Sequence, residues 1–187
     1  MRASVSQLII MAMILSSCAN KSSNSNAMFH VELSDISINT NGIFVHVAVT
    51  NETNSVALLD RYNVCRNGDV KNDLFRIHPL GYSEDILLPY VSVWVNRGLP
   101  PYAKSEYLEF TPGEKREYLF NLVTIYDFDS SESEAYSVWY EVQNPRPISS
   151  AEISLLMSTK RRFNLSKEQM SSFSGLDSTD QCWEINR

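Results

Sequence analysis

The chain has 187 residues, and its 22 Asp and Glu against 16 Lys and Arg give a formal net charge of −6 at pH 7. Phosphate backbones are bound largely through neutralisation by Lys and Arg, so this acidic balance argues against a nucleic-acid partner. The length suits one domain of ordinary size, or one domain and a tail.

The first seventeen residues have the features of a secretory signal. Arg2 is their one charge, and the apolar run that ends at Leu15 is shorter than the roughly 20 residues that span a bilayer. Ser16 and Ser17 are small enough for a signal peptidase to fit the chain there. Residues 1–17 are therefore predicted to be a cleaved signal peptide, and the protein is expected to be exported.

The tetrapeptide Leu15-Ser16-Ser17-Cys18 resembles the bacterial lipobox, in which a cysteine receives a diacylglyceryl thioether. The resemblance implies a lipoprotein in which Cys18 becomes the acylated N-terminus and carries fatty acids such as palmitate. More than one acyl chain is needed for stable membrane anchoring. Because Ala19 stands where an aspartate commonly retains such proteins in the inner membrane, the cell outer membrane is favoured, on its periplasmic or surface face. An ordinary signal followed by an incidental cysteine is the alternative.

Residues 18–27 are small and polar and predict a flexible, lipid-anchored tether. Beyond it, Phe29, Val31 and Leu33 alternate with polar neighbours, which is the period of a half-buried strand. Asn41-Gly42 suits the centre of a type I′ hairpin turn, because both residues accept positive φ. Further strands are predicted at 55–60, 73–78, 86–95, 106–110, 116–122 and 134–143.

Roughly seven to nine short strands, rich in Val, Ile, Tyr and Phe, predict an all-β fold. The expected architecture is an immunoglobulin-like antiparallel β-sandwich over residues 28–144, followed by an extension, 145–187, packed on or near it. Residues 149–158 suit either one more strand or a short helix. Ser166 and Gln169 have the spacing of a helix capping box, and Gly175 is placed to stop that helix.

Cys65 and Cys182 remain as a pair once Cys18 is assigned to lipid. Thiols that meet in an oxidising compartment tend to be oxidised, so a disulfide between them is predicted. Two free thiols that never approach are the alternative. Neither cysteine has a second ligand at metal-binding spacing, and no metal or cofactor is expected.

Several segments between residues 30 and 143 together share the order and spacing of a known module. They are Leu59-Asp60-Arg61-Tyr62-Asn63, Asn72-Asp73-Leu74-Phe75, Pro89-Tyr90, Asn96-Arg97-Gly98-Leu99-Pro100, Tyr107-Leu108, Thr111-Pro112-Gly113-Glu114, Leu122, Tyr126-Asp127-Phe128 and Tyr136-Ser137-Val138-Trp139-Tyr140. They resemble the N-terminal β-sandwich domain that accompanies bacterial aspzincin (deuterolysin-like) metallopeptidases. Those peptidases continue into a catalytic domain with a zinc-binding H-E-x-x-H helix. Here no histidine has another four residues away, and the chain beyond Asn144 is too short for such a domain.

No catalytic residue is predicted from the sequence. His30 and His46 fall on strand faces, His78 precedes a proline in an expected loop, and no G-x-S-x-G motif is present. The acidic run 127–134 lacks the spaced ligands and central glycine of an EF-hand loop.

Residues 91–102 are the stretch that most suggests binding. Trp94, Arg97 and Tyr102 are of types enriched at binding hot spots. Packing in the core is the leading expectation for Trp94, and an exposed binding surface formed by all three residues is the alternative. The resulting hypothesis is a non-enzymatic module of the cell envelope, held to the membrane through the lipid on Cys18, that binds a protein such as a peptidase. A small hydrolase whose site is not recognisable from sequence is the alternative.

Overall fold

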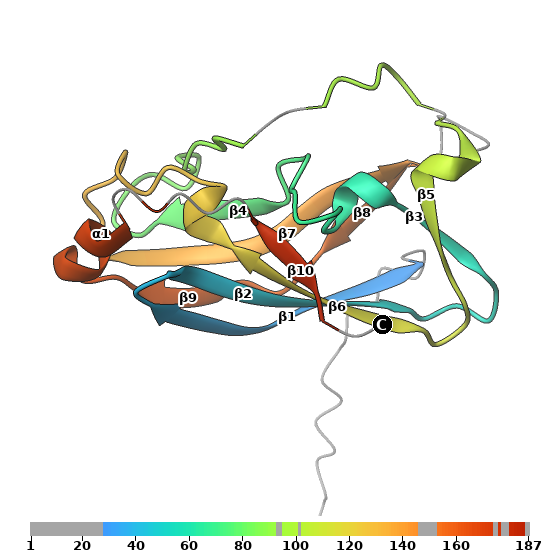
Figure 1. Cartoon of the computed structure of the whole chain (residues 1–187), viewed down its shortest axis with the longest axis horizontal. Coiled ribbons are helices and arrows are strands. Elements are labelled where there is room, and N and C mark those ends of the chain that lie inside the picture. Colours follow the sequence, from blue (N-terminus) through green and yellow to red (C-terminus); the bar gives the residue numbers. More distant parts are fainter. Residues whose placement is uncertain are drawn as a thin grey trace, which may run out of the picture.

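The computed structural model describes residues 28–92, 95–100, 102–145, 153–173, 176 and 180–185. The predicted signal peptide and tether, with Cys18, lie outside these residues, as do Trp94 and Gly175. The described part is mostly antiparallel β-structure arranged as a sandwich with one short α-helix, so the predicted all-β class is confirmed (Figure 1). Within it, no helix has the length and apolar character needed to cross a membrane.

The first sheet has the strand order β1-β2-β6-β10. Its strands are β1 (Phe29–Asn39), β2 (Gly42–Asn51), β6 (Lys115–Asn121) and β10 (Cys182–Glu184). Phe29, Val31 and Leu33 are buried and their neighbours His30 and Glu32 are exposed, as the alternation predicts.

The β1–β2 hairpin is confirmed, but its turn lies one residue earlier than predicted. Asn39 pairs with Gly42, so Thr40 and Asn41 form the loop and the glycine opens β2. Gly42 has a φ of 145° and lies against the Asn121 side chain, where a Cβ would come within 2.1 Å of Oδ1. The glycine is therefore required by this close approach rather than by the centre of the turn.

The second sheet is built on β7 (Ala135–Pro145). It pairs with β4 (Phe75–Pro79) along one edge, and with β8 (Ile153–Met157) and β9 (Arg161–Asn164) along the other. A two-stranded sheet of β3 (Ala57–Asp60) and β5 (Tyr107–Phe110) lies beside β7. The three short 3-10 helices are η1 (Arg61–Asn63), η2 (Lys104–Glu106) and η3 (Leu122–Thr124).

Residues 86–92 and 95 form no strand, in contrast to the strand predicted at 86–95. Only Tyr90 pairs, in an isolated bridge with Tyr126. Pro89 has no N–H to donate, so it interrupts a ladder at this point.

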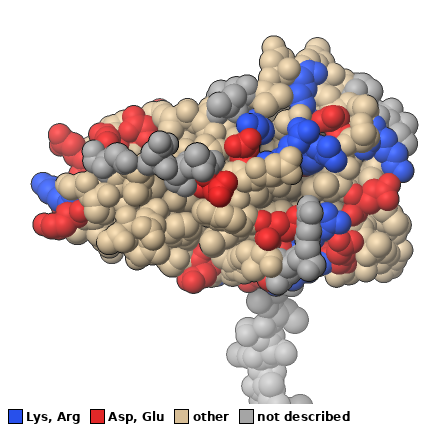
Figure 2. Space-filling view, in the orientation of Figure 1, with Lys and Arg blue, Asp and Glu red and all other residues tan. Residues whose placement is uncertain are grey.

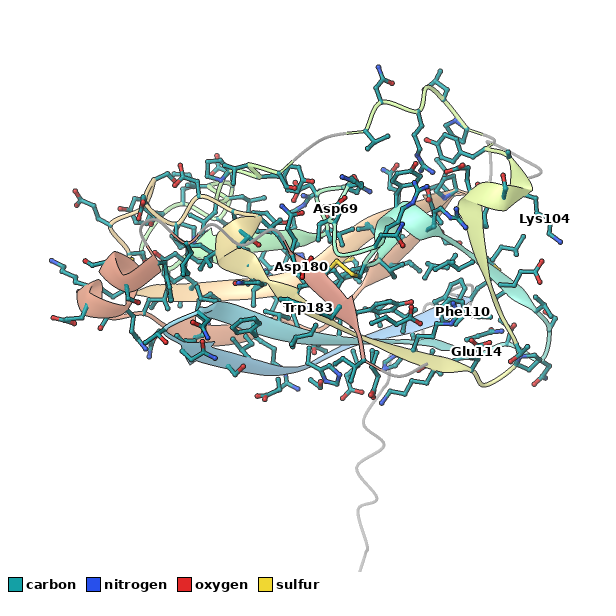
Figure 3. All side chains as sticks on the ribbon, viewed as in Figure 1. Asp69, Lys104, Phe110, Glu114, Asp180 and Trp183 are labelled. Atoms are coloured by element: carbon teal, nitrogen blue, oxygen red, sulfur yellow. A yellow bond between two sulfur atoms is a disulfide. The ribbon has the colours of Figure 1, made fainter. Side chains whose placement is uncertain are left out.

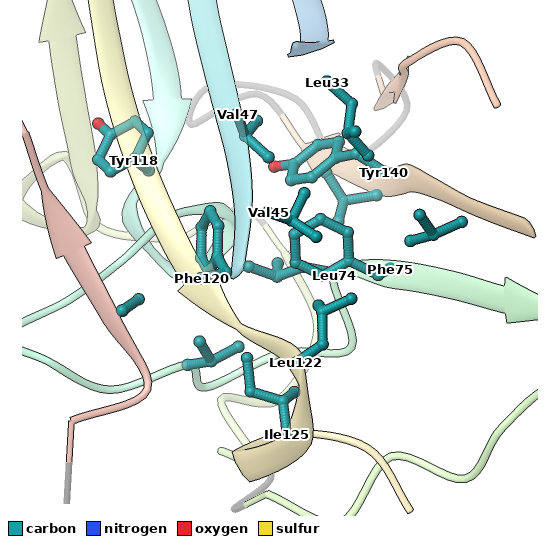
Figure 4. Close-up of a cluster of buried hydrophobic side chains, with 14 of the residues drawn as sticks. Leu33, Val45, Val47, Leu74, Phe75, Tyr118, Phe120, Leu122, Ile125 and Tyr140 are labelled. Carbon is teal, nitrogen blue, oxygen red and sulfur yellow. The ribbon is translucent and has the colours of Figure 1, made fainter. Parts of the chain in front are cut away.

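The core lies between the sheets and is rich in aromatic rings (Figure 4). Phe75 from β4 makes edge-to-face contacts with Phe120, Tyr126 and Tyr140, with ring centroids 5.2, 6.4 and 5.8 Å apart. Such geometry places the positive edge of one ring against the negative face of the next. Through Phe75, β4 thus packs against β6 of the first sheet as well as against β7 of its own sheet.

The chain beyond Asn144 contributes to both sheets. The ambiguous segment 149–158 contains β8, so a strand forms there rather than a helix. The capping box is confirmed: Ser166 N donates to Gln169 Oε1 over 2.8 Å, and Gln169 N donates to Ser166 Oγ over 3.3 Å, at the start of α1 (Lys167–Phe173). The predicted disulfide between Cys65 and Cys182 is present and holds β10 beside the loop that follows η1.

Candidate functional site

A loop described at residues 95–100 and 102, called the loop 95–102 below, stands out from the two sheets at the top of Figure 1. Between it and the sandwich lies a pocket of about 390 Å³, lined on the sandwich side by Asp60, Tyr62, Lys71, Asn72, Gln143, Pro145 and Ile153. The predicted binding residues Arg97 and Tyr102 both line this pocket. The structure therefore brings these two together, while Trp94 lies outside the described residues.

Arg97 attaches the loop to the sandwich. Its Nη1 donates to Asp60 Oδ1 over 3.0 Å and its Nη2 donates to Asp60 Oδ2, a bidentate pair. The Arg97 guanidinium carbon also lies 4.0 Å from the ring centre of Tyr62 and 3.8 Å from that of Tyr102. A planar guanidinium binds a carboxylate with both nitrogens and stacks on aromatic faces, so one side chain makes both contacts.

Asp60 is the buried half of this pair. It ends β3 and is only 2% exposed, and Oδ1 also accepts a hydrogen bond from Tyr62 N over 3.0 Å. The Arg97 side chain is 16% exposed and supplies the opposite charge that a buried carboxylate requires. Burial, assisted by the charge of Asp60, raises the pKa of the nearby Tyr107 phenol.

The tip of the loop is apolar and exposed. Leu99 is 91% exposed and Val95 is 36% exposed. The protruding part at the top of Figure 2 is mostly uncharged. Gly98 has a φ of 73°, and its N–H donates to Asn96 Oδ1 over 3.1 Å. The glycine lets the chain reverse at the point where it presents Leu99.

Sequence reasoning missed Asp60 and Tyr62 as partners of Arg97. A signal was present, because Asp60 ends a predicted strand as a charged residue beside the buried Leu59. Its partner lies 37 residues away, beyond the reach of any local pattern.

One cross-strand contact bears on the hydrolase alternative. The Ser34 hydroxyl lies 2.6 Å from His46 Nδ1, and His46 Nε2 lies 3.9 Å from Glu117 Oε2. The residue types are those of a nucleophile, a base and an acid. The contact is on the outer face of the first sheet, and none of its three residues lines the pocket under the loop 95–102. Glu117 also pairs with Lys115 over 2.7 Å. It joins the β1 bulge between Leu33 and Asp35 to β2.

Among the residues that the structure describes, no group of three or more His, Cys, Asp and Glu is arranged to hold a metal ion. Comparison with models of known protein families and with curated proteins finds no match to this chain. The resemblance to the aspzincin-associated domain therefore stays a prediction.

Proposed function

We propose that this protein is a non-enzymatic, lipid-anchored module of the cell envelope that binds another protein through the loop 95–102. The observation that carries the proposal is the loop itself: an exposed Leu99 is presented by a segment that Arg97 holds to a buried carboxylate. Loops positioned by a rigid sandwich are a common place for binding residues. Because Arg97 fixes the base of the loop, ordering the apolar tip on binding costs less entropy than ordering a free segment would.

The pocket under the loop offers a partner both apolar and polar contacts. Leu99 and Ile153 line it, and the amides of Asn72 and Gln143 supply hydrogen-bonding groups. Exposed side chains continue the apolar character along β8 at Ile153, Leu155 and Met157. A partner that covers Leu99 would therefore also meet the outer face of β8.

Crosslinking in intact cells tests this proposal. A photoreactive benzoylphenylalanine at position 99 should give one discrete adduct, which mass spectrometry identifies as an envelope protein. Val56, which is 55% exposed and precedes β3, is the matched control position. Equal adducts from positions 56 and 99, or none from position 99, would contradict binding by this loop.

The anchor is tested separately. Cells fed labelled palmitate should incorporate the label into the protein, and a Cys18→Ser variant should remain unlabelled. Incorporation that survives this substitution would show that the lipid is carried elsewhere, and absence of label from both forms would overturn the lipoprotein proposal.

A further inference from the structure

A second groove, of about 720 Å³, runs between η1 and β10 on another side of the molecule. Arg61, Arg66 and Asn67 line one wall, and Asp180, Trp183 and Glu184 line the other. The Cys65–Cys182 disulfide also lines it, and Figure 3 shows this bond close to Asp180 and Trp183. The loop 95–102 takes no part in this groove.

The two arginines of the groove differ from most others in the described part of the chain. Arg76, Arg97 and Arg116 each bind a carboxylate. The Arg61 side chain makes no hydrogen bond or ion pair with any described residue. Among the described residues, the Arg66 guanidinium donates only to the Tyr62 hydroxyl, and its carbon lies 4.8 Å from that ring centre. Two arginines whose guanidinium groups bind no carboxylate among the described residues thus line one groove of an acidic protein.

The walls of the groove are held in place. Asn67, with a φ of 52°, and Gly68, with a φ of 87°, form a tight turn closed by hydrogen bonds between Arg66 and Asp69. Gln181 N donates to Gly68 O over 2.7 Å, and Val70 N donates to the Gln181 side chain over 2.9 Å. These bonds and the disulfide tie the C-terminal strand to the arginine wall, so the groove is formed before any ligand arrives.

Trp183 gives the groove an apolar platform. It is 38% exposed, and its ring lies 6.1 Å from that of Phe44. The charge of Glu184 acts on Arg116, and the Asp180 side chain lies close to Gly68, in the turn that follows Arg66. An anionic group of a ligand would therefore bind on the side of Arg61, while the apolar body of that ligand covers the Trp183 indole.

We propose that this groove binds a small organic anion, in which a carboxylate or phosphate is carried on an apolar or ring-shaped body. Arg61 binds the anionic group, Arg66 adds positive charge from a position set by Tyr62, and Trp183 contacts the body. A guanidinium fork matches either a carboxylate or a phosphate, so the two sources share one recognition chemistry.

Titration of the full, disulfide-bonded chain by NMR tests the proposal, with the indole signal of Trp183 and the arginine side-chain signals as readouts. The probes are N-acetyl-phenylalanine, phenyl phosphate and, as the neutral control, N-acetyl-phenylalanine amide. Comparison of the first two distinguishes a carboxylate ligand from a phosphate ligand. The expected result is saturable shifts at Trp183 with at least one anion and none with the amide.

Two substitutions sharpen the test. Arg61→Gln should weaken binding of the anion by roughly tenfold or more, as expected for a lost charge-assisted hydrogen bond. Arg162→Gln, at an exposed arginine of β9 outside the groove, should leave it unchanged. Asp180→Asn should tighten binding, because it removes a negative charge from the opposite wall. Absence of shifts with both anions, equal response to the amide, or equal binding by Arg61→Gln and the parent chain would overturn the proposal.

Discussion

At the scale of single residues, the buried charge of Asp60 constrains the structure. A carboxylate that is 2% exposed is costly unless it is paired and hydrogen-bonded, and Arg97 satisfies both of its oxygens. The pair therefore couples the conformation of an exposed loop to the stability of the sandwich. A substitution that breaks this pair is therefore expected to lower the free energy of unfolding of the whole domain.

Arg97→Ala should lower the free energy of unfolding by about 3 kcal/mol, because it leaves the buried Asp60 carboxylate without an opposite charge. Arg97→Lys retains the charge but not the bidentate geometry, so it should lower the free energy of unfolding by less than Arg97→Ala does. Urea unfolding measures both. Arg162→Ala, at an exposed arginine, should stay within about 0.5 kcal/mol of the parent chain. A similarly small effect for Arg97→Ala would contradict the assigned role of the pair.

Ser34 distinguishes a binding module from a hydrolase. Its contact with His46 lies on an open sheet face, and Glu117 shares its carboxylate with Lys115, so we expect no reactive serine there. A fluorophosphonate probe should leave Ser34 unmodified in peptide mass spectrometry. Labelling of Ser34 that disappears in a His46→Gln variant would instead favour the hydrolase alternative.

At the scale of elements, the Asn144 side chain joins β3 to β7. Its Oδ1 accepts from Asp60 N over 2.7 Å and its Nδ2 donates to Leu58 O over 3.1 Å, so one amide takes the place of a backbone ladder. This arrangement positions the end of β3, and with it Asp60, beside the second sheet. The Asp60–Arg97 pair, which holds the loop 95–102, therefore depends on the contact of Asn144 with β3.

Asn144→Ala should lower the free energy of unfolding by about 1–3 kcal/mol, because it leaves a buried N–H and C=O without partners. Hydrogen exchange at the amide of Asp60 should become faster. The adjacent Gln143→Ala removes an exposed amide and serves as the matched control. Unchanged protection of the Asp60 amide in Asn144→Ala would show that other contacts hold β3.

At the scale of the whole molecule, the disulfide connects residues 117 apart in sequence and secures the last described strand. A Cys65→Ser, Cys182→Ser double variant should lose about 4–5 kcal/mol, because its unfolded chain is less constrained. Urea unfolding of the variant and of the oxidised parent chain measures the difference. A loss below about 1 kcal/mol would contradict the expected contribution of the bond.

Buried tyrosines predict a loss of stability in alkali. Burial raises the pKa of Tyr126 and Tyr140 well above the ordinary value, and Asp73 adds to the shift at Tyr126. In the unfolded chain these phenols ionise near about pH 10, so this stability is fully present below that pH and is lost progressively as pH rises from there toward the raised folded-state pKa. Unfolding free energies at about pH 8 and about pH 11 should show the fall, and Tyr126→Phe should show less of it.

Much of the strand pattern and the local signals were readable from the sequence alone, but the strand predicted at 86–95 is not formed by the described residues there, and β9 and β10 were not predicted. Alternation at Phe29, Val31 and Leu33 depends on near neighbours, and the capping box of Ser166 and Gln169 spans a single helical turn. The disulfide followed from the number of cysteines and the expected compartment. These features were predictable because few residues determine each of them.

Only the tertiary structure decided the loop site and the use of the C-terminal residues. Asp60 and Arg97 are 37 residues apart, and Asp60 and Asn144 are 84 apart. The glycine at position 42 is explained by the side chain of Asn121 rather than by its own turn. The physical reason is the same for Arg97, Asn144 and Gly42. Each is required by a neighbour that is distant in the sequence, and the packing of the sheets places that neighbour against it.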